Sequence, residues 1–163
     1  MATKDDFSPE DWNALVRAPL IAGLAISIAD PGGPIELTKE SMAAMKSVLE
    51  PVGGDQPELV AAVRADFEAE ARDHHNPVKG YKPRSPQEIV AELKRVNGIV
   101  SAKATPEEAE GFRNLLRTAA QRAAEAAKEG GFMGFGGKEV ISAGEQRMLD
   151  EIDAALAPPA ALS

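Results

Sequence analysis

The amino-acid sequence predicts an all-α fold, a single-domain bundle of about six helices with a buried N-terminal helix. Apolar residues recur at helical spacing along most of the 163 residues, and no run of alternating β-branched residues predicts a strand. Helix start signals recur as well, with a hydroxyl residue followed three positions later by an acidic residue. A chain of this length can bury a core of its own, so we expect residues 1–163 to form one helical domain.

The first helix is predicted to begin after Ser8 and to run through the most apolar part of the chain. Its apolar positions repeat at helical intervals, at Trp12, Leu15, Val16, Leu20, Leu24 and Ile28. Between Leu20 and Ile28 the pattern is apolar on nearly every side, which is typical of a central, buried helix. Pro19 is expected to kink it.

Five further starts divide the rest of the chain. Thr38 and Pro57 are the weaker signals, and Ser85, Thr105 and Ser142 the stronger ones. The pair at 97–98, Asn-Gly, is typical of a C-terminal stop for the helix that begins after Ser85. Residues 73–84 are predicted to be a long connecting loop, and residues 1–7 and 157–163 flexible ends.

Composition excludes several classes of function. The chain has no cysteine, which excludes disulfides, thiolate zinc sites and cysteine nucleophiles. A net charge of −8 argues against a general nucleic-acid binder, which needs a basic face. The polar N-terminus predicts no signal peptide, and the run from Pro19 to Ala29 is about half of the ~20 residues that a transmembrane helix needs. A cytoplasmic protein without a transmembrane segment is therefore expected.

Catalytic signals are weak. The two histidines, His74 and His75, are adjacent, and no Gly-x-Ser-x-Gly elbow occurs, so no catalytic triad is predicted. Paired carboxylates remain an open alternative, because acids are plentiful and their pairing in space is invisible in a sequence. On balance the sequence favours a protein that is not an enzyme.

Residues 130–139, GGFMGFGGKE, form an unusual glycine-rich segment. Its spacing does not fit a phosphate-binding loop, because Glu139 follows Lys138 where serine or threonine is required. One interpretation is a turn that folds Phe132, Met133 and Phe135 over the end of the bundle. The other is an exposed apolar finger that contacts a partner protein, a membrane surface or a second copy of the chain.

Two clusters near the middle of the chain are candidate binding sites. Asp66, Glu70 and His74 lie four residues apart, so they would share a face and could bind a divalent metal ion if the helix extended that far. The alternative is a solvated acidic face that ends in a histidine cap. The only local basic cluster, at Lys79, Lys82 and Arg84, could bind an anion or acidic partner, or could simply balance the acidic helices.

Two segments share a further pattern, residues 24–49 and 136–156. Each has a glycine-rich turn, an apolar residue, a hydroxyl cap and an acidic helix start. The pattern resembles the TerB-like family of tellurite-resistance proteins over about a third of the chain.

This resemblance implies an all-helical bundle of bacterial type with a divalent-metal site built from turn carboxylates. In this chain Asp30 would match the acidic turn residue, and Glu40 or Glu145 the later glutamate, with Glu36 completing a possible site. The alternative is that Glu145 is only a capping acid and Asp30 only a turn residue.

These observations together predict a small cytoplasmic helical binding or scaffold protein. Its unknown partner would contact the glycine-rich segment or a groove between helices. A TerB-like protein that binds a divalent metal ion is the alternative, and a carboxylate hydrolase is a third hypothesis with no specific residue pair.

Overall fold

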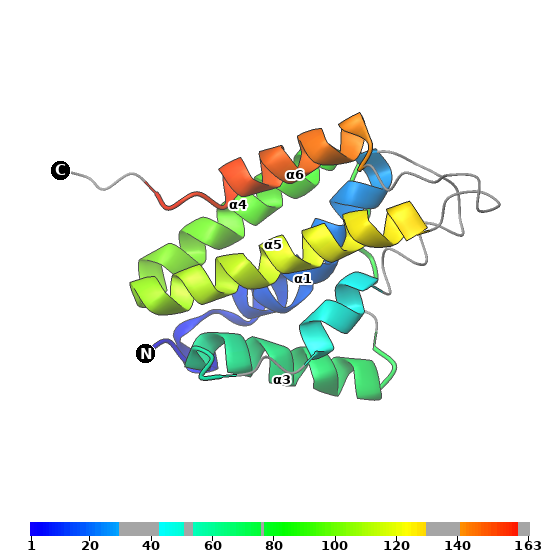
Figure 1. Ribbon diagram of the computed structural model, residues 1–163. Coiled ribbons are helices and arrows are strands. Elements are labelled where there is room, and N and C mark those ends of the chain that lie inside the picture. Colours follow the sequence, from blue (N-terminus) through cyan, green and yellow to red (C-terminus); the bar gives the residue numbers. More distant parts are fainter. Residues whose placement is uncertain (30–42, 51–53, 76, 130–140, 160–163) are drawn as a thin grey trace.

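The computed structural model describes residues 1–29, 43–50, 54–75, 77–129 and 141–159, and in these ranges the chain is helical and contains no strand (Figure 1). The predicted all-α bundle is confirmed. Its elements are a short 3-10 helix η1 (Lys4–Asp6), α1 (Pro9–Ala29), a helix over residues 43–49, α3 (Glu58–Arg72), α4 (Pro86–Lys103), α5 (Pro106–Glu129) and α6 (Ala143–Ala155).

The N-terminal helix α1 is the centre of the bundle, as the sequence predicts. It packs against α3, α4, α5 and α6, and its large side chains Leu15, Ile21 and Ile26 are fully buried. Among the described helices, α1 alone is long and apolar enough to cross a membrane, but 72% of its most apolar stretch is buried inside the protein. Such burial is what the central helix of a bundle requires.

A glycine lets three helices meet closely. A Cβ atom at Gly23 of α1 would lie 2.7 Å from the Cβ of Ala44 and 3.6 Å from the Cβ of Ala123. Ala44 belongs to the helix over residues 43–49, and Ala123 to α5. Small residues at all three positions therefore fix the helix over residues 43–49 against α1, where it borders the candidate site described below.

The four strong start signals all act as helix caps. The hydroxyl groups of Ser8, Ser85, Thr105 and Ser142 each accept a hydrogen bond from the backbone N–H three residues later. At Ser142 the carboxylate of Glu145 also accepts the Ser142 N–H, which completes a capping box. The sequence therefore located these helix starts correctly.

One predicted helix end is wrong. The Asn-Gly pair at 97–98 does not stop α4, which continues to Lys103. Val96 and Val100 are both buried, so the core-facing stripe of α4 runs past Gly98. The side chain of Asn97 is also held by neighbouring helices, and burial with these contacts outweighs the weak helix propensity of glycine.

The segment over residues 1–7 packs against the bundle, which differs from the expected flexible end. Ala2 and Phe7 are only 2% and 6% exposed. The Ala2 N–H donates to the carboxylate of Glu108 on α5, and Lys4 pairs with Asp66 on α3. Two buried apolar side chains and these polar contacts tie the segment down. At the other end, residues 157–159 are exposed.

Candidate functional site

A largely apolar hollow lies between α1, the helix over residues 43–49, the end of α3 and the following connection. We call it the apolar pocket, and its volume is about 430 Å³. It is lined by Leu20, Leu24, Met45, Phe67, Ala71, His74, His75, Pro77 and Val78. Its walls are therefore largely aliphatic or aromatic, with two imidazoles as the ionisable groups.

Helical spacing explains how the walls are assembled. Leu20 and Leu24 lie one turn apart on α1, and Phe67 and Ala71 lie one turn apart on α3. Phe67 is buried, whereas Met45 is 36% exposed and is one of the few large apolar side chains at the surface of the described structure. The flexible, polarisable side chain of methionine suits a wall that adapts to its contents.

The end of α3 places both histidines at this pocket. The His75 N–H donates to the Glu70 carbonyl at 2.9 Å, and the His74 N–H donates to the Ala71 carbonyl at 3.3 Å. This is the Schellman pattern of helix termination, in which the residue after the C-cap, here His74, takes a left-handed conformation. His74 has φ +57° and is the only described residue other than glycine with a positive φ.

A second hollow adjoins the apolar pocket. We call it the polar hollow, and it is lined by Asn13, Arg17, Glu70, His75, Pro77 and Lys79. His75 and Pro77 line both hollows, so the two share a wall. The charged side chains of the polar hollow therefore lie next to the apolar lining of the pocket.

Arg17 is held at the polar hollow by an aromatic ring. Its guanidinium carbon lies 4.8 Å from the ring centre of Tyr81, and one terminal nitrogen lies 3.5 Å from the Glu92 carboxylate. Its Nε atom is buried and has no hydrogen-bond partner among the described residues. Burial is the main cause that raises the pKa of the Tyr81 hydroxyl, and the nearby Glu92 adds to it. The tyrosine is therefore a neutral platform for the cation.

Lys79 reaches the polar hollow from a tight turn. The Tyr81 N–H donates to the Val78 carbonyl at 3.0 Å, and Gly80 at the third position has φ +83°. A positive φ at this position is typical of a type II turn and favours glycine. The turn puts Lys79 at its exposed tip, beside the hollow.

The residues that the sequence suggested for a metal site are separated. Asp66 accepts hydrogen bonds from Lys4 Nζ at 2.6 Å and Trp12 Nε1 at 2.7 Å. The Lys4 hydrogen bond, helped by the one from Trp12, holds the pKa of the Asp66 carboxyl below its usual value. Glu70 lines the polar hollow, and His74, two residues beyond the end of α3, lines the apolar pocket.

No group of three or more histidine, aspartate or glutamate side chains that could hold a metal ion occurs among the described residues. The remaining predicted site residues lie outside the described ranges, namely Asp30, Glu36, Glu40, Phe132, Met133 and Phe135. Their roles stay predictions.

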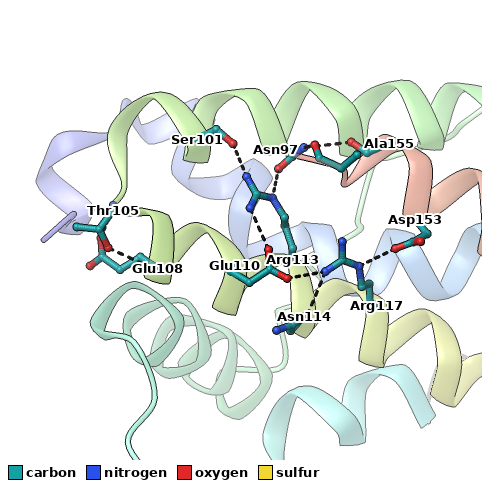
Figure 2. Close-up of polar contacts among 11 residues, drawn as sticks. Asn97, Ser101, Thr105, Glu108, Glu110, Arg113, Asn114, Arg117, Asp153 and Ala155 are labelled. Carbon is teal, nitrogen blue, oxygen red and sulfur yellow. Dashed lines mark hydrogen bonds and ion pairs between the residues drawn. The ribbon is translucent and has the colours of Figure 1, made fainter. Parts of the chain in front are cut away.

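A buried polar cluster joins α4, α5 and α6 (Figure 2). Arg113, whose side chain is 7% exposed, donates to Asn97 Oδ1 at 2.8 Å, to Ser101 Oγ at 2.8 Å and to the Glu110 carboxylate at 3.1 Å. Asn97 in turn donates to the carbonyls of Ala155 and Ala157. Since these groups are engaged by protein partners, the cluster holds helices together and is not a candidate site.

The sequence signalled part of this site. The basic cluster around Lys79 was visible as a possible anion site, and the histidines as possible ligands. Arg17 gave no signal, because a single arginine in an apolar helix cannot be told from a solvated one without knowing that Tyr81 covers it. Leu20, Met45 and Phe67 looked like ordinary core residues because their spacing is that of a core stripe.

Comparison with known proteins does not assign the chain to a family. No family model matches the chain, and no curated protein or solved structure is significantly similar to it.

Proposed function

We propose that this protein is a small binding protein and that its apolar pocket holds the apolar part of a small molecule. The observation that carries the proposal is the pocket itself, a hollow of about 430 Å³ with mostly apolar walls contributed by four separate segments. Ligand sites typically enclose roughly 300–1,000 Å³ and combine apolar walls with a few polar groups. Here the two imidazoles of His74 and His75 supply polar groups at one edge.

The backbone at His74 supports the same proposal. A left-handed conformation at a residue with a side chain costs about 1–2 kcal/mol, and glycine would occupy this helix end without that cost. Strained residues tend to lie at functional sites. A histidine held in this conformation at the edge of the pocket is therefore consistent with a role in binding.

Two other hypotheses remain alongside this one. Contact with a partner protein or self-association through Phe132, Met133 and Phe135 stays a prediction, as does a TerB-like metal site at Asp30 and Glu40. Both sets of residues lie outside the described ranges, so the test below concerns the pocket alone.

The test is a titration with a neutral, environment-sensitive dye such as Nile red. We expect saturable binding with one dye molecule per chain in the unaltered protein. Ala71→Phe, which adds a ring to a half-buried position in the wall of the pocket, should abolish it. Ala65→Phe is the matched control, because Ala65 is exposed on the same helix and does not line the pocket.

Thermal unfolding of both variants gives the control for folding. Equal dye binding by the unaltered protein and Ala71→Phe would refute the proposal. A second measurement uses His74→Gly, which should stabilise the fold by about 1 kcal/mol by relieving the left-handed strain while weakening binding. Increased stability with unchanged binding would show that His74 only ends the helix.

A further inference from the structure

We infer that the ligand is an amphipathic monoanion, a carboxylate with an apolar chain, whose head lies in the polar hollow while its chain fills the apolar pocket. This inference rests on the proposed function and names the ligand class for the same site. It is carried by the adjacency of the two hollows and by the charges that line the second.

The first step is geometric. The apolar pocket and the polar hollow share the lining residues His75 and Pro77, so the two hollows are neighbours. A molecule seated in the pocket has only these two residues to pass before it reaches the polar hollow. A purely apolar ligand would leave the polar hollow unused, whereas an amphipathic ligand matches both. Because one hollow is apolar and the other is polar, an amphipathic ligand would bind in one orientation, with its polar end toward Asn13 and Arg17.

The second step is charge. Arg17 and Lys79 line the polar hollow together with one carboxylate, Glu70, which leaves a surplus of one positive charge among these three side chains. This surplus occurs in a chain whose net charge is −8. A single negative charge on the ligand complements it, whereas a dianion would be opposed by Glu70 and a cation by both basic side chains.

The third step is donor capacity at Arg17. One terminal nitrogen is 3.5 Å from Glu92, a long contact, and Glu92 is engaged at 2.9 Å by Arg95. The hydrogen bond and charge of Arg95 are the main cause that lowers the pKa of Glu92, which stays ionised through its own partner. The Arg17 guanidinium lies over Tyr81 and, among the described residues, makes only this one long contact at its terminal nitrogens, so it retains terminal N–H donors for a carboxylate.

The test compares three molecules with the same chain and different heads, octanoate, octanol and octylammonium, by calorimetric or NMR titration. We expect octanoate to bind more tightly than the other two. Arg17→Gln should weaken octanoate about tenfold, since a hydrogen bond to a charged group is lost. Lys79→Gln, at an exposed turn, should weaken it roughly two- to fivefold. Octanol binding should not change in either variant, which also shows that the pocket is intact.

Two more variants sharpen the comparison. Lys82→Gln removes an exposed lysine of the same connection that does not line the hollow, so octanoate affinity should stay unchanged. Glu70→Gln removes the opposing carboxylate and should tighten octanoate binding by roughly two- to fivefold.

The possible outcomes separate this inference from the proposed function. Equal affinities for octanoate and octanol, insensitive to Arg17 and Lys79, would overturn the anionic head while leaving an apolar binding site. A preference for octylammonium would also overturn it and assign the head to Glu70. Failure of all three molecules and of the neutral dye to bind would overturn both.

Discussion

Asn97 is expected to be one of the most sensitive polar positions in the protein. The residue is 5% exposed, and its side chain makes three hydrogen bonds (Figure 2). Nδ2 donates to the carbonyls of Ala155 at 3.2 Å and Ala157 at 2.9 Å, and Oδ1 accepts from Arg113 Nε at 2.8 Å. The side chain therefore connects α4 to the guanidinium on α5 and to the C-terminal end of α6.

The cost of Asn97→Ala follows from these three contacts. Each neutral hydrogen bond contributes about 1 kcal/mol, and the one from the charged guanidinium about 1.5–3 kcal/mol. The carbonyl of Ala157 can return to water, because that residue is exposed, so its loss is partly offset. We expect a decrease of about 3–4 kcal/mol in the free energy of unfolding. For a domain of this size the midpoint should fall by roughly 6–16 °C.

Urea denaturation followed by far-UV circular dichroism measures this loss, provided that the m-value is unchanged. Asn114→Ala is the matched control. Asn114 is exposed on α5, and its side-chain oxygen accepts one hydrogen bond, from Arg117. Its loss should cost less than about 0.5 kcal/mol.

A double-mutant cycle with Arg113→Met tests the mechanism directly. The two substitutions remove the same contact, so their coupling energy should be about 1–3 kcal/mol. If the two losses of unfolding free energy are additive, the contact between Asn97 and Arg113 does not contribute to stability. If Asn97→Ala costs no more than Asn114→Ala, the idea that this cluster holds α6 in place is refuted.

Three further substitutions test other parts of the structure. Gly98→Ala should stabilise the protein by roughly 0.5–1 kcal/mol in the same denaturation assay, because Gly98 is inside α4 and no atom lies within 4 Å of the added Cβ. The Lys4 hydrogen bond lowers the pKa of Asp66 in the folded protein. The stability that Asp66 contributes is therefore fully present above its unfolded-state pKa of about 3.9 and is lost as the pH falls through its folded-state pKa. Asp66→Asn should therefore flatten the acid end of the stability curve, as monitored by the fluorescence of Trp12. For the TerB-like hypothesis, native mass spectrometry with Ca²⁺, Mn²⁺ and Zn²⁺ should show one ion per chain that Asp30→Asn removes, and a bare mass under every condition would contradict it.

The helix starts could be predicted from the sequence because each depends on neighbours in the chain. Ser85 and Ser142 cap their helices through the backbone N–H groups three residues later, and this contact is fixed by local spacing. The helix end at Gly98 could not be predicted in the same way. Whether α4 stops there depends on the burial of Val100 and on the partners of Asn97, which come from α5 and α6.

The candidate site was harder to predict from the sequence than the helix starts, because it depends on where α3 ends, and local sequence alone does not fix a helix end. A set of Asp66, Glu70 and His74 requires one continuous helix, whereas α3 stops at Arg72. The left-handed backbone at His74 turns the chain, and this turn brings His74 and His75 to the pocket beside Leu20 and Met45. A spacing rule assigns residues to one face only while the helix lasts. In this protein His74 and His75 follow directly after the C-cap of α3, so the local geometry that ends the helix also places these two side chains at the pocket.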